Sequence, residues 1–152
     1  MAPRAINPPP RMIKVKSIDH VAIAVTDAAS SAATFARLLG LHAEPLEHVA
    51  SQKTDVVSLR PADGGGDIEF ISPAGNDSLS RFLEKRGPGI HHICFEVEDI
   101  ASALTTLKTA GVPLVDEQPR PGGRGRLVGF LHPKATGGIL IELSQKLEGE
   151  SC

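Results

Sequence analysis

The chain contains an internal repeat, and this repeat limits the folds that it can adopt. The stretch IDHVAIAVTDAASSAATFARLLGL begins at Ile18, and IHHICFEVEDIASALTTLKTAGV begins at Ile90. When the two stretches are aligned, His20 falls on His92. Each copy has the pattern of an alternating strand, an aspartate at a helix N-cap position, and a helix closed by glycine. We therefore expect two copies of one structural unit.

The second part of each copy supplies a matching pair of glutamates. The segment DIEFISP (67–73) resembles ILIELSQ (139–145), so that Glu69 falls on Glu142. Glycine-rich turns separate further β-type runs between each helix and these segments. The expected strands lie near residues 43–49, 54–60 and 67–72 in the first copy, and near 113–116, 126–131 and 138–144 in the second.

Each copy is therefore a βαβββ unit, and the expected fold class is α+β. Because one helix covers only one face of its strands, two tandem βαβββ modules can curl into a cup-shaped mixed eight-stranded sheet with helices on the outer face. We expect module one over about 17–73 and module two over about 88–146, within a single domain over 17–146. The proline-rich residues 1–16 are expected to be a disordered leader, and residues 147–152 a flexible tail.

Strand alternation predicts which side chains face the inside of the cup. In HVAIAV (20–25) the large apolar residues share one face, and His20 lies with two alanines on the other. In HICFEV (92–97), His92 shares its face with a cysteine and a glutamate. The bulky faces should pack under the helices and the histidine faces should line a cavity. The same alternation places His91 on the packing face.

Two histidines and two glutamates at matching positions indicate a metal site. A lone histidine on a strand is more often a structural residue than a ligand, and a lone glutamate in an alternating strand is more often exposed. The coincidence of all four with the repeat favours a shared role, because a buried lone carboxylate is costly unless it is paired or bound to metal. We expect one divalent transition metal per chain, bound by His20, Glu69, His92 and Glu142.

Composition excludes several other classes of function. The formal net charge is −2, which provides no electrostatic footprint for nucleic acid. No apolar run approaches the roughly 18 residues that a membrane-spanning helix needs. The two cysteines, Cys94 and Cys152, do not make a disulfide framework. We expect a cytoplasmic protein with no membrane or nucleic-acid partner.

The segment PRPGGRGR (119–126) is rich in glycine but is not a P-loop. It lacks the glycine–lysine–Ser/Thr ending and does not open a helix. The ordinary interpretation is a flexible hairpin loop with solvated charges. The alternative is that cations of this region hold an anionic ligand at the mouth of the cup. The residues expected in that role are Arg120, Arg124, Arg126 and Lys134.

Several stretches resemble the methylmalonyl-CoA epimerase family of the vicinal-oxygen-chelate superfamily. The most specific are GIHHICFEV (89–97) and FLHPKATGGILIEL (130–143), and the resemblance spans about residues 18–145. It implies a homodimer that interconverts (2R)- and (2S)-methylmalonyl-CoA, or a related acyl-CoA, by removing and returning the C2 proton through a metal-chelated enolate. The metal ligands that it implies are again His20, Glu69, His92 and Glu142.

The implied reaction needs a base near each face of C2 and a Lewis acid where the enolate charge develops. Glu142 is the first candidate base and Glu69 is its pseudo-symmetric partner, with Glu96 as an outside alternative. Some members of the family carry a glutamate on the preceding strand, where Ser58 stands here, and a serine is a poor base at neutral pH. The ligand types suit cobalt, manganese, nickel or zinc.

Two other functions fit the same fold. Glyoxalase I would use a similar metal site on a glutathione hemithioacetal, and a non-catalytic protein of this fold would bind a small molecule without metal. The run HPKATGGILIEL (132–143) favours the epimerase over the glyoxalase. The four intact ligand positions argue against a metal-free binding protein.

Overall fold

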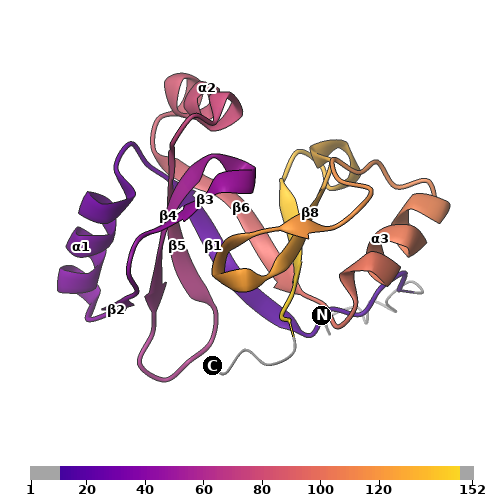
Figure 1. Ribbon diagram of the computed structural model, residues 1–152, viewed down its shortest axis with the longest axis horizontal. Coiled ribbons are helices and arrows are strands. Elements are labelled where there is room, and N and C mark those ends of the chain that lie inside the picture. The colour runs from indigo at the N-terminus through magenta and orange to yellow at the C-terminus, as the bar shows by residue number, and fades with distance from the viewer. Residues whose placement is uncertain (1–10, 148–152) are drawn as a thin grey trace, which may run out of the picture.

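The computed structural model describes residues 11–147, and both predicted modules are present in one curled sheet (Figure 1). Module one contains β1 (Ser17–Ala24), α1 (Ala28–Leu39), β2 (His42–Ala43), β3 (Glu47–Val49), the 3₁₀ turn η1 (Ala50–Gln52), β4 (Thr54–Arg60) and β5 (Asp67–Pro73). The helix α2 (Asp77–Arg86) connects the modules. Module two contains β6 (Gly89–Glu96), α3 (Ile100–Thr109), β7 (Arg120–Pro121), η2 (Gly123–Gly125), β8 (Leu127–Leu131), η3 (Pro133–Ala135) and β9 (Ile141–Gln145).

The strands form a single mixed sheet in the order β2-β4-β5-β1-β6-β9-β8-β7, with β3 also paired to β4. Strands β1 and β6 are antiparallel and join the two modules. Within the modules, β1 is parallel to β5 and β6 is parallel to β9. The α+β class and the cup built from tandem units are confirmed. The second expected strand of module one is split into β2 and β3, so nine strands occupy eight positions across the sheet.

Module two departs from the prediction at its edge. The strand expected near 113–116 is reduced to one bridge between Leu114 and Leu131. The carboxylate of Asp116 accepts the backbone N–H of Phe130 at 2.9 Å, and so takes the place of a ladder partner. The edge strand β7 instead lies in the glycine-rich segment that we expected to be a loop. An edge position suits Pro121, because proline has no N–H to offer a further strand.

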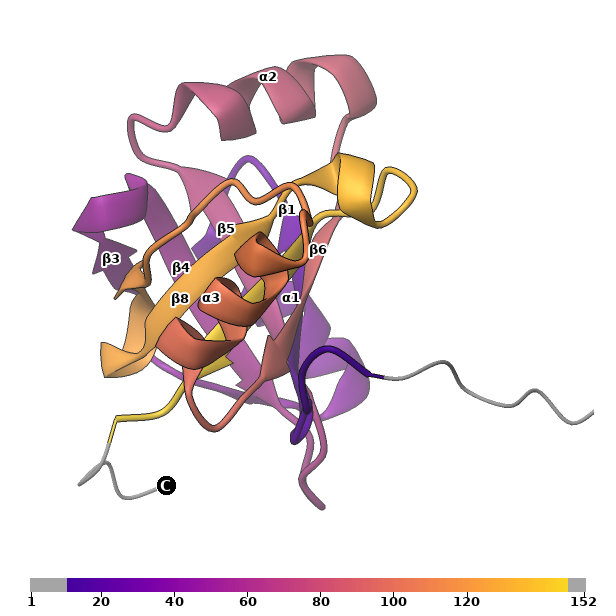
Figure 2. The same ribbon diagram turned by 90° about the vertical axis from the view of Figure 1, so that its right-hand side faces the viewer.

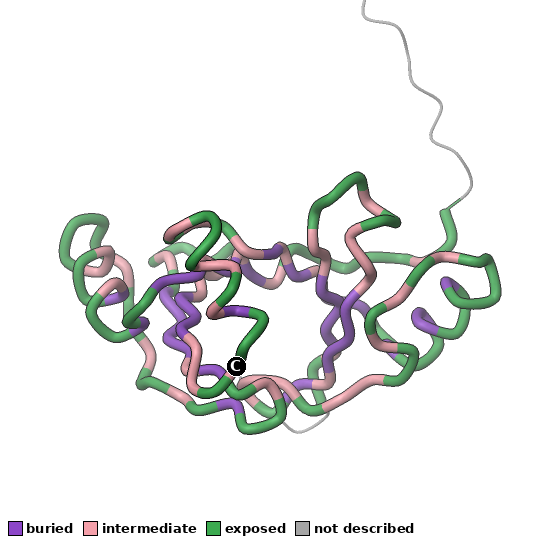
Figure 3. Tube along the Cα trace, turned by 90° about the horizontal axis from the view of Figure 1, so that it is seen from above, coloured by how far each residue is buried: buried purple, intermediate pink, exposed green. Residues whose placement is uncertain are grey.

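Helices α1 and α3 begin as the repeat predicts. The N-cap side chains of Asp27 and Asp99 accept the backbone N–H groups of Ser30 at 3.1 Å and Ser102 at 3.0 Å. Helix α1 ends at Gly40, whose φ of 66° is a left-handed conformation that favours glycine. The two helices lie at opposite flanks of the curled sheet, outside it (Figure 3). The predicted placement of the helices on the outer face is therefore confirmed.

The apolar core is divided between the outer flanks of the sheet. Under α1 the buried residues are Val25, Ala28, Ala32, Val57, Leu59 and Phe70. Under α3 they are Val97, Ile100, Ala103, Leu104, Leu107 and Leu143. Ile13, before β1, also packs against the α3 cluster. Residues 11–16 form no helix or strand, and the rest of the predicted leader and nearly all of the predicted tail lie outside the described residues.

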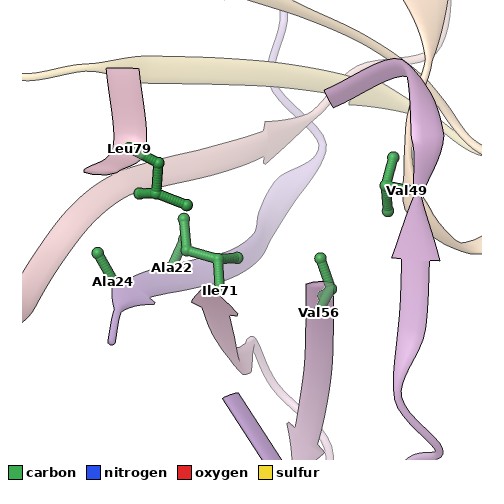
Figure 4. Close-up of a cluster of buried hydrophobic side chains, with 6 residues drawn as sticks. All are labelled: Ala22, Ala24, Val49, Val56, Ile71 and Leu79. Carbon is green, nitrogen blue, oxygen red and sulfur yellow. The ribbon is translucent and has the colours of Figure 1, made fainter. Parts of the chain in front are cut away.

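Helix α2 was not predicted, and it covers part of the inside of the cup. The side chain of Asn76 caps the helix by accepting the backbone N–H of Leu79 at 2.8 Å. Leu79 packs into an inner-face cluster with Ala22, Ala24, Val49, Val56 and Ile71 (Figure 4). Two views show α2 lying across one end of the sheet (Figures 1 and 2). Within residues 11–147, no helix has the length and apolar character needed to cross a membrane.

Candidate metal centre and its cavity

Three of the four predicted ligands converge at the bottom of the cup. His20 on β1, His92 on β6 and Glu142 on β9 are all buried. The Nε2 atoms of the two histidines are 3.4 Å apart, and Oε1 of Glu142 lies 3.3 Å and 3.4 Å from them. Ligand atoms that share an ion through bonds of about 2.0–2.2 Å lie about 3.0–3.5 Å from each other. The three side chains therefore have the spacing and the donor chemistry of one coordination sphere.

Glu69 on β5 lies beside these three ligands. Its Oε2 is 3.5 Å from Nδ1 of His20, the ring nitrogen that faces away from the other two ligands. The Glu69 side chain nevertheless lines the same cavity as His92 and Glu142. The structure thus brings all four predicted residues to one place, with Glu69 positioned either as a fourth ligand or as a base.

A β-bulge at Asp19 places its carboxylate beside Nδ1 of His20. Ile18 pairs with Phe95 and His20 pairs with Cys94, so that Asp19 has no partner on β6. The bulge breaks the strand alternation, and Oδ2 of Asp19 lies 2.7 Å from Nδ1 of His20. An Nδ1–H donated to this carboxylate fixes the ring and leaves the Nε2 lone pair directed at the other ligands.

A second bulge, at the matching position of β6, overturns the prediction for His91. His92 and Ile90 pair with consecutive residues of β1, so that His91 is the extra residue. Its side chain lines the cavity, with Nδ1 at 2.9 Å from Nδ1 of His92 and the ring 4.9 Å from that of Phe82 on α2. Burial and the neighbouring His92 lower the pKa of His91 to about 4, so this imidazole is neutral at pH 7.

The side chains of Arg124 and Arg126 lie beneath the metal centre. Arg126 donates to Oδ1 of Asp19, and Arg124 donates to Oδ2 of Asp19 at 3.1 Å and to Asp67 at 2.9 Å. Burial alone would raise the pKa of Asp19, but the hydrogen bond with His20 and the charges of both arginines outweigh it and hold that pKa at about 2. The two guanidinium groups therefore neutralise inner carboxylates, whereas the ordinary interpretation of the sequence was a loop with solvated charges and its alternative was anion binding at the mouth of the cup.

A cavity of about 530 Å³ opens above the metal centre, with walls from both modules and from α2. Phe130, Ile71 and Leu79 supply apolar surface to its lining. Among the four cations proposed as ligand contacts, only Arg120 lines this cavity, where its Nε lies 3.3 Å from Asp116. Lys134 is exposed on η3.

The two cavity glutamates differ in their electrostatic environment. Burial raises the pKa of Glu69. Burial also opposes ionisation of Glu142, but the charge of His92 and the hydrogen bonds with both histidines hold the pKa of Glu142 well below its usual range. A carboxylate that remains ionised suits metal binding, whereas a carboxylate with a raised pKa suits proton transfer near neutral pH.

The other candidate bases do not line the cavity. Ser58 is buried on β4 and pairs with Glu69 across the sheet. The carboxylate of Glu96 accepts from Ser17 Oγ at 3.2 Å and lies 3.4 Å from Nζ of Lys146. Neither side chain contributes to the surface that surrounds the metal centre.

The family model of the glyoxalase/bleomycin resistance protein/dioxygenase superfamily matches residues 19–130. The chain therefore belongs to this superfamily. It is 37% identical over 130 residues to the human mitochondrial methylmalonyl-CoA epimerase, covering 84% of this chain and 73% of the relative. It is 39% identical over 131 residues to the ethylmalonyl-CoA/methylmalonyl-CoA epimerase of Cereibacter sphaeroides, covering 84% and 96%.

The fold agrees with a solved member of the same group. The crystal structure of methylmalonyl-CoA epimerase from Mycobacterium tuberculosis matches with a TM-score of 0.82 and 32% identity, covering 88% of this chain and 89% of that one. Within the superfamily, the chain thus belongs to the methylmalonyl-CoA epimerase family. The resemblance inferred from the repeat and its motifs is confirmed.

Proposed function

We propose that this chain is an isomerase that interconverts the (2R) and (2S) forms of methylmalonyl-CoA. The observation that carries the proposal is the convergence of His20, His92 and Glu142, the last two of which line the cavity, in a chain of this family. The name of the Cereibacter relative also includes ethylmalonyl-CoA, so a 2-ethyl substrate belongs to the same proposal.

The residues present fit a divalent ion. His20, His92 and Glu142 would hold it, with Glu69 as the fourth ligand if its carboxylate turns toward the other three. Imidazole and carboxylate donors suit cobalt, manganese, nickel or zinc, and we propose one such ion per chain. A bound ion would act as a Lewis acid toward the thioester and carboxylate oxygens of the substrate.

Proton transfer is assigned to the carboxylates that face the cavity. We place Glu69 before Glu142 as the base, because coordination and a low pKa both weaken Glu142 as a proton acceptor. Glu69 would take the C2 proton on one face of the substrate. Glu142, the pseudo-symmetric partner of Glu69, would return a proton to the other face. The apolar side chains of Phe130, Ile71 and Leu79 would exclude water from the enolate.

Deuterium exchange at C2 of methylmalonyl-CoA in heavy water tests the proposal. We expect exchange by the metal-loaded protein, about one divalent ion per chain by elemental analysis, and loss of exchange after chelation. Absence of exchange together with turnover of a methylglyoxal–glutathione hemithioacetal would identify a glyoxalase instead. Absence of both activities would leave a binding protein.

We also propose that the chain is a homodimer. The β1–β6 pair lies between α1 and α3 (Figure 1), and Ile18 on β1 and Ile90 on β6 are 53% and 65% exposed, each paired with an apolar residue of the other strand. An apolar strip of this kind on a sheet is typical of a surface that a second copy covers. Analytical ultracentrifugation should show a dimer that Ile90→Asp converts to a monomer. A wild-type monomer at micromolar concentration would refute this.

A cytoplasmic location is part of the same proposal. Cys94 is buried and has no disulfide partner within residues 11–147, as suits a protein of a reducing compartment. Cell fractionation with an antibody against the chain measures the location directly, and recovery in an organelle fraction would correct it.

A further inference from the structure

A second groove, of about 320 Å³, adjoins the cavity of the metal centre. It lies between α2 and the segment around η3. The two cavities share four lining residues, Ser78, His91, Pro133 and Leu140. The groove therefore lies directly beside the main cavity, with these four residues at the boundary between the two.

The groove is basic and contains no acid. Its charged lining residues are Arg81, Lys85 and Arg86, all exposed on α2. None of the three forms an ion pair within the part of the chain that the structure describes. The arginines of the 120–126 segment differ in this respect, because each lies beside an aspartate. The three cations of α2 are thus available to an external anion, as is Lys53 in the lining of the main cavity.

Aromatic rings connect this basic groove to the metal centre. The guanidinium of Arg86 lies 5.3 Å from the ring of Phe82, which meets His91 edge-on at 4.9 Å. The ring of His91 lies 5.2 Å from that of the ligand His92. A molecule that extends along this line needs a group for the metal centre, a largely apolar middle and an anionic end.

We infer that Arg81, Lys85 and Arg86 bind the phosphate groups of the substrate's CoA handle. This inference rests on the proposed function, because it takes the acyl thioester to lie at the metal centre. The pantetheine arm would then pass His91, and the diphosphate and the ribose phosphate would meet the three cations. Guanidinium groups suit phosphate through paired hydrogen bonds, and a lysine adds a point charge.

The test compares two substrates and two triple variants. Arg81→Gln, Lys85→Gln and Arg86→Gln, combined, remove the charges and keep good helix formers at exposed positions. The matched control combines Lys14→Gln, Lys16→Gln and Arg37→Gln, which removes three exposed charges elsewhere. Both are assayed for C2 exchange with methylmalonyl-CoA and with methylmalonyl-pantetheine, which has no phosphate. Binding of free CoA is measured by calorimetry.

We expect the α2 variant to raise KM for methylmalonyl-CoA by about 10- to 100-fold and to weaken CoA binding similarly, with kcat unchanged. Its kinetics with the pantetheine ester should match the wild type, and the control should change neither substrate. Equal losses on both substrates, or unchanged KM and CoA affinity, would overturn the inference. So would a Lys53→Gln variant, in the lining of the main cavity, that alone reproduces the effect.

If the chain is not an epimerase, the exchange assay gives a different result from those above. In that case wild-type protein exchanges the C2 proton of neither substrate. Calorimetry with free CoA then tests the inference by itself. Weaker CoA binding by the α2 variant than by the wild type supports the inference, and equal binding overturns it.

Discussion

Replacing Asp19 with alanine should weaken metal binding although no ligand is removed. The carboxylate of Asp19 lies 2.7 Å from Nδ1 of His20 and so fixes both the tautomer and the orientation of this ring. Removal of such a partner typically costs about 10- to 100-fold in metal affinity, which is about 1.4–2.7 kcal/mol. Asp19→Asn, which keeps an acceptor oxygen but loses the charge, should fall between alanine and wild type.

Asp19→Ala should also lower the free energy of unfolding of the metal-free protein. Arg126, whose side chain is 10% exposed, would lose its carboxylate partner and remain as a buried charge. Breaking a buried pair from one side costs about 3–5 kcal/mol. Chelator competition at fixed pH measures the metal affinity, and urea unfolding of the metal-free form measures the stability.

Asp67→Ala is the matched control. It removes a partner of Arg124 at 2.9 Å, and although Asp67 pairs with His20 across β5 and β1, its carboxylate forms no hydrogen bond with the rings of His20 or His92. Metal affinity in this variant should stay within about twofold of wild type, since His20 keeps its carboxylate. Wild-type affinity in Asp19→Ala, or an equal loss in Asp67→Ala, would refute the role that we assign to Asp19.

Three further predictions follow from the described contacts. Glu69→Gln should slow C2 exchange by about 10²- to 10⁴-fold while metal content stays near one per chain, and loss of the metal would show that Glu69 is an obligatory ligand. Because the pKa of Asp19 is lowered from 3.8 to about 2 in the folded state, its ionised form contributes about 2 kcal/mol above pH 4, which is lost as the pH falls toward 2. The stability difference between wild type and Asp19→Asn, measured by urea unfolding without metal, should therefore narrow between pH 6 and pH 2, and a constant difference would contradict this. Burial raises the pKa of Cys94 to about 12, so in a Cys152→Ser background iodoacetamide at pH 8 should label the thiol only in urea, and rapid labelling of the native protein would be the contrary result.

The sequence predicted the two modules and the proximity of the four candidate ligand residues because both depend on the repeat. The matching strands β1 and β6 pair with each other where the two modules meet, and β5 and β9 lie beside them, so matching residues that face the inside of the cup from these strands come close together. His20 and His92 occupy matching positions, and so do Glu69 and Glu142. The N-caps Asp27 and Asp99 followed from local chemistry and needed no tertiary information.

The remaining features depend on contacts that alternation and spacing do not encode. The bulge at His91 is a property of the register between β1 and β6, and regular alternation placed this ring on the wrong face. The partner of Asp19 is Arg126, 107 residues away, in a segment that reads as a solvated loop. Helix α2 falls between the two copies and has no counterpart in module two. The sequence nevertheless held a signal for the two bulges. Their extra residues, Asp19 and His91, occupy matching positions of the repeat.

The antiparallel contact of β1 with β6 has a consequence for the ancestry of the site. Each half of the chain supplies one imidazole and one acid to the centre, so a solitary ancestral unit would have needed an identical companion, joined through this self-complementary edge. In such a dimer of identical units, every residue of the site would be present twice. In a single chain this restriction is absent, and Asp19 and His91 stand at equivalent points. The two faces of a substrate can thus meet chemically distinct surroundings even at the centre of the repeat.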